Sequence, residues 1–223
     1  MFSKPVRSAL VCVLLTLPLP ALALDRGTFP KPLQDVALSH EKLQTAVFAG
    51  GCFWGTQSVF ERVKGVRKTV AGYAGGKANT ATYNQVITET TGHAESVEVT
   101  YDPSVITYGG LLRIFFSVAH DPTTLNRQGP DEGTSYRSAI FYTSAEQQKI
   151  AEAYIAQLDA AHVFKSKIVT EVTPLKGFYR GEAYHQDYAL HNPDNPYIQV
   201  CDRPKIDALK REYPDLFVDY RGQ

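Results

Sequence analysis

Hydrophobic and polar positions alternate along residues 94–101, AESVEVTY. Val97, Val99 and Tyr101 fall on one side of an extended chain, and the residues between them are polar. This alternation predicts a β-strand with one face in the core and the other facing solvent. The Asp-Pro dipeptide at 102–103 ends the strand.

Short apolar runs bounded by glycine or turn residues predict further strands over residues 45–50, 66–76, 138–143 and 167–172. Apolar residues at helical spacing predict helices over residues 53–63, 110–120 and 145–161, with a short helix near 205–212. Gly65 stops the first helix, and Asp121–Pro122 ends the second. Ser144 and Gln147 form a capping box for the third.

The order of these elements is β-α-β-β-α-β, followed by another helix and strand. This order predicts an α/β (α+β) fold, a ferredoxin-like split βαβ sandwich with an added helix and strand. Right-handed crossovers place both helices of the core on one face of the sheet. Beyond the added strand we expect a long irregular C-terminal excursion, because the segment is rich in tyrosine and proline.

The first 23 residues have the pattern of a secretory signal peptide. Lys4 and Arg7 supply a positive region, ALVCVLLTLPLP an apolar region, and ALA at 21–23 a cleavage site. The apolar run is too short to span a bilayer and has no stop-transfer flank. We therefore expect an exported protein, periplasmic or secreted, with no membrane span in its mature form.

Cleavage of the signal peptide after residue 23 would change the net charge and the sulfur-containing residues of the chain. Loss of Lys4 and Arg7 leaves 21 of the 23 basic side chains against 23 acidic ones, a net charge of −2. That balance does not favour nucleic acid or an anionic membrane as a partner. Met1, the only methionine, is lost with Cys12, so Cys52 and Cys201 remain. A chain without methionine cannot suffer methionine oxidation, which suits an oxidising compartment.

Cys52 lies in the stretch GGCFWG, where a predicted strand ends and a helix begins. The positive end of a helix dipole lowers a thiol pKa and favours the nucleophilic thiolate. Gly50 and Gly51 leave the sulfur accessible. The alternative is an inert cysteine buried between strand and helix, or a structural disulfide with Cys201.

GGCFWG resembles the active-site motif of the peptide methionine sulfoxide reductase A family. Further stretches agree in the same order: GYAGG at 72–76, TGHAESVEVTYDP at 91–103, HDPTTLNRQGPDEGTSYRSAIFY at 120–142 and YHQDY at 184–188. The resemblance covers residues 46–200. We accordingly expect an N-terminal extension over 24–44, a catalytic reductase domain over 45–200 and a C-terminal tail over 201–223 that wraps the domain.

The resemblance implies thiol-dependent reduction of methionine (S)-sulfoxide, free or in proteins, and thus oxidative-damage repair. It assigns Cys52 as the nucleophile, Glu95 as the acid, and Tyr83 and Tyr136 as phenols that hold the sulfoxide oxygen. It also implies no metal and no organic cofactor. Without the resemblance, Glu95 would be interpreted as an exposed strand carboxylate and the tyrosines as packing residues.

The resemblance assigns substrate binding to three further residues. Phe53 and Trp54 match an aromatic wall for the substrate methyl group, and Asp131 matches a polar residue of the pocket. Burial of one methyl group contributes only about 1 kcal/mol, so its value is orientation. The simpler interpretations are core packing for the two aromatic residues and a turn cap for Asp131.

The chemistry explains these residue types. A sulfoxide sulfur is electrophilic, but its oxygen leaves only if it is protonated as negative charge builds there. A carboxylic acid in an apolar pocket has a raised pKa and can supply that proton near neutral pH. Phenol hydroxyls add hydrogen bonds to the same oxygen. The attacking cysteine is left as a sulfenic acid.

The sequence allows two ways of reducing the sulfenic acid in the last step of the catalytic cycle. Many members of the family reduce the sulfenic acid with a second cysteine in the C-terminal tail, but Ile198 stands where many relatives have it. Cys201, three residues later, is either a displaced resolving cysteine or an inert apolar residue. In the second case an external, thioredoxin-like thiol is the electron donor. We expect a monomer.

Two other classes of protein are alternatives for a chain with this cysteine. A cysteine hydrolase would need a histidine base, and GGCFWG does not match the papain signature. A binding module held by a Cys52–Cys201 disulfide would have no free thiols. His185, Asp187 and His191 lack a metal-binding pattern, and GYAGGKANT lacks P-loop spacing. His93 precedes Glu95 by two, so in a strand both point to the same side.

Overall fold

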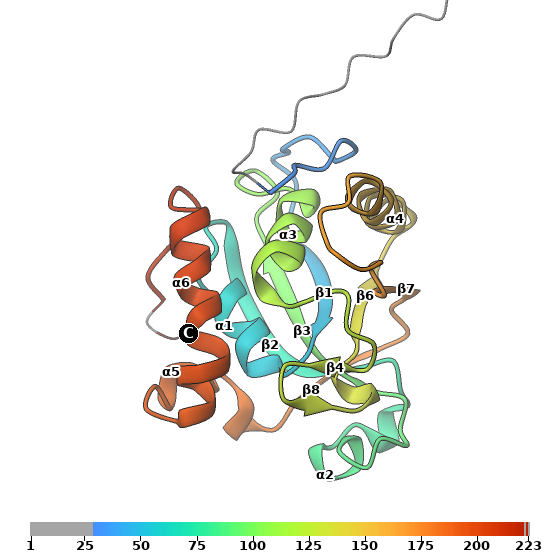
Figure 1. Cartoon of the computed structure of the whole chain (residues 1–223), viewed down its shortest axis with the longest axis vertical. Helices are drawn as coiled ribbons and strands as arrows, with labels where there is room; N and C mark the ends of the chain where they lie inside the picture. The colour runs from blue at the N-terminus through green and yellow to red at the C-terminus, as the bar shows by residue number, and fades with distance from the viewer. Residues whose placement is uncertain (1–28, 221, 223) are drawn as a thin grey trace, which may run out of the picture.

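The structure, a computed structural model, describes residues 29–220 and residue 222 (Figure 1). The predicted signal peptide lies outside the described residues, and so does Cys12. The predicted domain limits stay predictions. Across the described part of the chain, no helix is long and apolar enough to cross a membrane.

A six-stranded sheet forms the centre of the molecule, in the order β7-β6-β1-β3-β2-β8. Neighbouring strands are antiparallel except the β6–β7 pair. The strands are β1 (Gln44–Gly50), β2 (Val66–Ala74), β3 (Ala94–Tyr101), β6 (Ser138–Tyr142), β7 (Glu171–Pro174) and β8 (Phe178–Arg180). The inner order β6-β1-β3-β2 is that of a split βαβ fold, so the predicted fold class is confirmed. A separate two-stranded ribbon pairs β4 (Arg127–Gln128) with β5 (Asp131–Glu132).

The helices are α1 (Phe53–Phe60), α2 (Tyr83–Val86), α3 (Tyr108–Ile114), α4 (Ala145–Ala160), α5 (Tyr188–His191) and α6 (Arg203–Glu212). Single 3₁₀ turns occur at Ala78–Thr80, Thr134–Tyr136 and Ala183–His185, and π-helical turns at Phe115–Ala119 and Ile198–Asp202. Helices α1 and α3 lie on the same face of the sheet, as predicted (Figure 1). Their shared core contains Phe48 of β1, whose ring stacks on Phe60 at 5.1 Å and on Phe115 at 5.0 Å between centroids.

Strand β3 follows the predicted alternation. Val97, Val99 and Tyr101 are completely buried on the helix side, and Glu98 of the other face is partly exposed. Because strand side chains alternate, Glu95 points to the same side as Val97, towards the helices. Opposite it on β2 lies Tyr73. The alternation therefore aims one carboxyl group into the core.

Two predicted boundaries are wrong. The strand expected over 167–172 begins only at Glu171, because the N–H of Ile168 donates to the side chain of Asp159 and that of Val169 to the carbonyl of Pro122. The first helix ends at Phe60, not at residue 63, because Val63 forms a β-bridge with Phe217. At Ile168 and Val169 the N–H groups bond to distant partners instead of a strand, and beside Val63 the pairing uses bonds from Lys64 to Leu216 and from Val218 to Arg62.

The predicted cap of α4 is confirmed, with one difference. The Ser144 hydroxyl accepts a hydrogen bond from the Gln147 N–H at 3.2 Å. The Gln147 side chain turns to the N–H of Thr143 at 2.9 Å, and it donates to the carbonyl of Thr45 on β1 at 2.8 Å. One side chain thus caps the helix and joins it to the sheet.

The C-terminal excursion is more regular than expected, since it contains β8 and α5 as well as α6, the helix predicted near 205–212. Helix α6 and the turn before it pack against α1 (Figure 1). The approach is close at Gly55 of α1, where an added Cβ would lie 2.1 Å from Oδ1 of Asp202. Glycine at position 55 therefore lets the end of the chain contact the helix that follows Cys52.

Candidate active site

Cys52 is the N-cap of α1, at the turn that joins β1 to this helix. It is 7% exposed. Gly51 before it has φ of 84°, and a Cβ there would lie 2.4 Å from the Gln128 side chain. The glycine is therefore needed both for its backbone conformation and for the close approach of the neighbouring loop.

The expected lowering of the Cys52 pKa is wrong. Burial of the thiol raises its pKa well above 9.0, and the charges of Glu95 and Asp202 raise it further. The backbone N–H of Trp54 and the ammonium of Lys205 act in the opposite direction but are outweighed. The helix terminus favours the thiolate, yet the loss of hydration has the larger effect. At neutral pH the resting enzyme holds a thiol.

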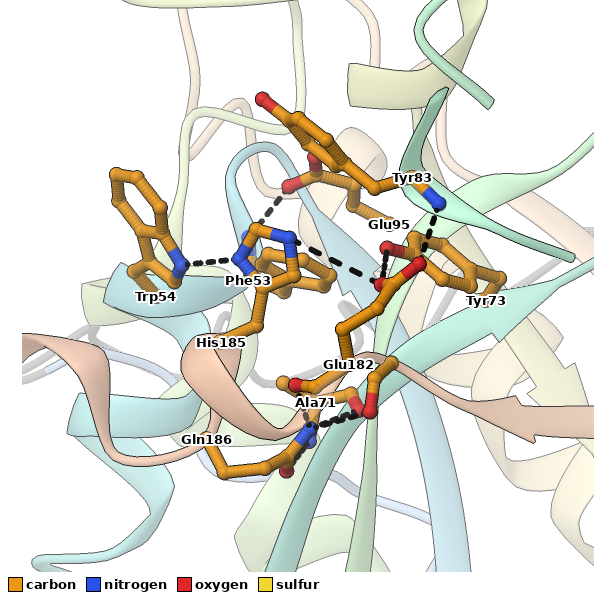
Figure 2. A network of polar contacts seen from close by, with 10 residues as sticks. Phe53, Trp54, Ala71, Tyr73, Tyr83, Glu95, Glu182, His185 and Gln186 are labelled. Atoms are coloured by element: carbon orange, nitrogen blue, oxygen red, sulfur yellow. Dashed lines mark hydrogen bonds and ion pairs between the residues drawn. The ribbon is translucent and has the colours of Figure 1, made fainter. Parts of the chain in front are cut away.

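Glu95 is 2% exposed, and its Oε2 accepts a hydrogen bond from the N–H of Phe53 at 3.0 Å (Figure 2). Burial raises its pKa from 4.5 to about 8. The Phe53 N–H lowers the pKa, while the charges of Asp131 and Glu89 raise it. The prediction of a carboxyl group that stays protonated near neutral pH is supported by this geometry.

Tyr83 and Tyr136 come from separate segments, the first residue of α2 and the last of a 3₁₀ turn. Burial raises the pKa of both phenols, and the charges of Glu95 and Cys52 raise them further. Both hydroxyls therefore keep their protons as hydrogen-bond donors. Both rings pack against the core cluster that contains Cys52, and both hydroxyls lie near enough to Cys52 and Glu95 for their charges to act on them.

The segment of Tyr83 is held by a carboxylate from the C-terminal excursion. Glu182 accepts a hydrogen bond from the N–H of Tyr83 at 2.8 Å and another from the Tyr73 hydroxyl at 2.8 Å (Figure 2). These hydrogen bonds outweigh the burial of Glu182 and lower its pKa. A charged acceptor thus fixes the start of α2 to the central sheet.

The two aromatic residues after Cys52 have different surroundings. Phe53 is 1% exposed and packs between Tyr73 and His185, at 5.8 and 4.8 Å between ring centroids. Trp54 is half-buried, and its ring stacks on Tyr188 at 3.7 Å. Its indole N–H donates to Nδ1 of His185 at 3.1 Å (Figure 2). This bond and the stacking fix the plane of the indole.

Asp131 is half-buried at the start of β5, and its Oδ2 accepts a hydrogen bond from the hydroxyl of Tyr197. The ring of Tyr197 in turn meets Trp54 edge-on, at 6.0 Å and 85°. Asp131 therefore belongs to the pocket and is not a simple turn cap. It joins the loop before β6 to the aromatic wall.

Sequence reasoning missed the residues that surround Trp54: His185, Tyr188 and Tyr197. The first two belong to YHQDY, a stretch that marked the resemblance without any role being assigned to its members. His185 is 1% exposed, and burial lowers its pKa, so it accepts the Trp54 N–H as a neutral ring. In the sequence, the indication of this role was a histidine, His185, between aromatic neighbours in YHQDY.

Cys201 lies in the π-helical turn before α6 and is partly exposed. Burial and the charges of Asp202 and Asp131 raise its pKa. Cys52 and Cys201 are both free thiols. Among residues 29–220 and 222, no group of three or more His, Cys, Asp or Glu side chains has an arrangement that holds a metal ion.

Comparisons with known proteins agree with this pocket. A sequence model of the family described as "Peptide methionine sulfoxide reductase" matches residues 44–216. "Peptide methionine sulfoxide reductase MsrA 2" of Mesorhizobium japonicum is 56% identical over 174 residues, 78% of this chain and 89% of the relative. The protein of the same name from Synechocystis is 49% identical over 189 residues, 83% of this chain and 88% of the relative.

A solved structure extends the likeness to the fold. Methionine sulfoxide reductase A of Corynebacterium diphtheriae superposes with a TM-score of 0.60 at 36% identity, covering 74% of this chain and 82% of that one. Fold, thiol and protonated carboxyl group together are those of an oxidoreductase. The chain belongs to the peptide methionine sulfoxide reductase family. The hydrolase and binding-module alternatives are therefore wrong, and the free thiols of Cys52 and Cys201 also contradict the disulfide that the binding module requires.

Proposed function

We propose that this protein reduces methionine (S)-sulfoxide, free or in oxidised proteins, to methionine, with Cys52 as the nucleophile. The observation that carries the proposal is the buried Glu95 carboxyl group, whose pKa is about 8 and which shares a pocket with the thiol. An acid that keeps its proton at neutral pH is what a departing sulfoxide oxygen needs.

The net reaction transfers one oxygen atom. The Cys52 sulfur forms a bond to the sulfoxide sulfur, and the sulfoxide oxygen takes the proton of Glu95. The thiol proton returns to Glu95. The hydroxyl group then moves from the substrate sulfur to Cys52 as the S–S bond breaks. Methionine leaves, and Cys52 is a sulfenic acid. The substrate sulfur is reduced by two electrons, and the cysteine sulfur is oxidised by two.

Because the pKa of Cys52 is raised, deprotonation of the thiol depends on the bound substrate. The resting thiol is protonated, so it becomes nucleophilic only as its proton leaves. Once the sulfoxide oxygen has taken the Glu95 proton, the carboxylate is the base for the thiol proton. Acid and base are then the same residue, and the thiolate forms only when a substrate is in place.

Opposite walls of the pocket would select the epimer. Phe53 and Trp54 offer an apolar wall for the methyl group, while Tyr83, Tyr136 and Glu95 offer protons to the oxygen. With sulfur facing Cys52, only one arrangement of methyl group and oxygen satisfies both walls. Preorganised donors aimed at developing charge supply a large share of catalysis in such pockets.

The proposal is tested by offering the purified protein the separate S and R epimers of a methionine-sulfoxide peptide with excess dithiothreitol. We expect methionine from the S epimer only, and none from the Cys52→Ser variant. Folded wild-type protein that turns over neither epimer would refute the proposal.

Two routes lead from the sulfenic acid back to the thiol, and neither needs a metal or an organic cofactor. In the first, Cys201 attacks the sulfenic acid, water leaves, and an external, thioredoxin-like dithiol then reduces the Cys52–Cys201 disulfide. In the second, the external thiol attacks the sulfenic acid directly with loss of water, and a second thiol releases Cys52 from the mixed disulfide. One equivalent of substrate without reductant distinguishes them by mass spectrometry. A loss of two hydrogens that disappears in Cys201→Ser assigns the first route. A dimedone adduct on Cys52 of the wild-type protein assigns the second.

We also propose that the protein works outside the cytoplasm, on the basis of the residues 1–23 pattern. Detection of the mature N-terminus near residue 24 in a periplasmic or secreted fraction tests this. Full-length protein retained in the cytoplasm would contradict it.

A further inference from the structure

A single carboxylate joins the two segments that carry the pocket tyrosines. Glu89 accepts three hydrogen bonds from a turn 45 residues further along the chain. Its Oε2 accepts from the Thr134 hydroxyl and the Ser135 N–H, both at 2.8 Å. Its Oε1 accepts from the Ser135 hydroxyl at 2.6 Å. Ser135 is buried, while Glu89 and Thr134 are half-buried, so these bonds are partly shielded from water.

The positions of both partners matter for the site. Glu89 closes the segment that begins with Tyr83, and its own N–H is bonded to the carbonyl of Val86 at 3.0 Å. Ser135 directly precedes Tyr136 in its 3₁₀ turn. The carboxylate therefore links the backbone next to one phenol with the backbone next to the other.

The backbone conformations of Glu89 and of Gly133 both allow this contact. Glu89 has φ of 61°, in the left-handed region that a glutamate occupies only at a cost. Gly133 has φ of 136°, and a Cβ there would lie 2.4 Å from the Glu89 carboxyl carbon. A glycine at position 89 would relieve the strain but supply no carboxylate.

Glu89 is charged at neutral pH. Its partial burial opposes the charge, but the hydrogen bonds from Ser135 and Thr134 outweigh burial and lower its pKa. The same charge is one of two that raise the pKa of Glu95. The residue thus acts on the site through position and, from a distance, through charge.

We propose that Glu89 is a positioning residue for the reductase reaction, an inference that rests on the proposed function. By clamping the Tyr136 turn to the Tyr83 segment, it sets the distance between the two phenol hydroxyls that face the sulfoxide oxygen. Small displacements of groups that stabilise developing charge have large effects on rate. The clamp therefore acts on turnover more than on substrate affinity.

The test uses the whole protein, an S-sulfoxide peptide and dithiothreitol. In Glu89→Ala we expect kcat to fall about tenfold, with KM changed less than about threefold. In Glu89→Gln the amide still accepts from Ser135 and Thr134 but carries no charge. We therefore expect kcat within about threefold of wild type below pH 7, with the alkaline limb of kcat/KM displaced to lower pH.

A double-mutant cycle separates positioning from loss of structure. If Glu89 acts through Tyr136, the Glu89→Ala, Tyr136→Phe double variant is about as active as Tyr136→Phe alone. The matched control is Asp35→Asn. The Asp35 carboxylate also bridges distant segments, accepting from the Thr107 hydroxyl at 2.6 Å and the Gly109 N–H at 2.9 Å. Its partners lie at the N-terminus of α3. Helix α3 lies apart from α2, on the other side of the sheet's lower edge (Figure 1).

We expect Asp35→Asn to leave kcat and the pH profile unchanged. Multiplicative losses in the double variant, an unchanged kcat in folded Glu89→Ala, or an equal loss in Asp35→Asn would each overturn the inference while the proposed function stands. A wild-type protein without turnover of the S epimer would overturn both. If Glu89→Ala does not fold, Ser135→Ala removes the hydrogen bond from the Ser135 hydroxyl to Glu89, and an unchanged kcat in this variant overturns the inference.

Discussion

The backbone N–H of Phe53 donates a 3.0 Å hydrogen bond to Oε2 of Glu95. This bond favours one position for the proton of the neutral acid. The carbonyl oxygen of a carboxylic acid is a better acceptor than its hydroxyl oxygen, so acceptance by Oε2 favours the acidic hydrogen on Oε1, where it is available to donate. One contact between α1 and β3 therefore orients the carboxyl group as well as anchoring it.

The first prediction concerns the pH profile. Glu95 loses its proton as the pH rises through about 8, so kcat/KM falls on that side. Glu95→Gln cannot transfer a proton, and we expect kcat to fall about 10²- to 10⁴-fold with folding retained. Glu98→Gln, on the other face of the same strand, is the matched control. A wild-type profile flat from pH 6 to about 9, or an active Glu95→Gln enzyme, would refute the role.

The second prediction concerns the reactivity of the resting thiol. In a Cys201→Ser background, Cys52 should react with iodoacetamide more slowly than free cysteine at neutral pH, because burial raises its pKa. Asp202→Asn removes a nearby negative charge and should speed the reaction. Asp207→Asn, an exposed partner of Arg203 on α6, should not. Rapid alkylation of unliganded wild-type Cys52 would show that the thiolate already exists at rest.

The third prediction concerns stability away from the pocket. Burial and a hydrogen bond with Asp187 raise the pKa of Glu61 from 4.5 to about 8, although Arg62 lies 3.4 Å away. The folded protein thus binds a proton that the unfolded chain releases. Glu61 favours folding below pH 4.5, and this contribution is lost as the pH rises towards about 8.

Glu61→Gln removes that dependence and can still donate to Asp187. Relative to wild type, we expect its free energy of unfolding to rise across this range, by about 1 kcal/mol or more at alkaline pH. Urea denaturation at several pH values measures the difference. Glu152→Gln, an exposed residue of α4, is the control. Equal pH dependence of the Glu61→Gln variant and the wild type would contradict the buried proton.

The fourth prediction concerns the contact of α6 with α1. Alanine at position 55 would place its Cβ 2.1 Å from Oδ1 of Asp202, a buried side chain that cannot move freely. We expect Gly55→Ala to destabilise the protein by about 1–3 kcal/mol through overpacking. Gly110→Ala on α3 would place its Cβ 3.0 Å from the Ile106 side chain and 3.2 Å from the Thr107 hydroxyl, milder contacts than at position 55, and serves as the control. A Gly55→Ala protein as stable as the control would mean that the two helices separate easily.

Local patterns were sufficient where neighbours in sequence make the structure. The alternation of β3 and the Ser144 cap were predictable because period and capping depend on adjacent residues. The strand limit at Glu171 was not, because it depends on a bond from Ile168 to Asp159. Hydrogen bonds to distant partners leave no periodic mark on the sequence.

The same distinction between local patterns and distant contacts applies to the residues of the site. Cys52, Phe53 and Trp54 were predictable because they share one motif. The regular strand fixes the side to which Glu95 points, but the role of Glu95 came from the resemblance, since the strand pattern alone favours an exposed carboxylate. The direction of the Cys52 pKa was not, since it depends on burial by segments far along the chain. Tyr188, which stacks on Trp54, follows it by 134 positions. Glu89 gave no indication at all, because its partners are met only in the folded chain.

The packing of the C-terminal excursion over α1 has a consequence for biosynthesis. A chain grows from its N-terminus, so Cys52 is made long before Tyr188, which stacks on Trp54, and Asp202, which lies against Gly55. Until these residues emerge, Trp54 lacks the ring that fixes its plane, and α1 lacks the segment that packs against it. A truncated product would therefore carry Cys52 on a helix without these contacts. The surroundings of the Cys52 thiol are therefore complete only after the C-terminal segment has been synthesised.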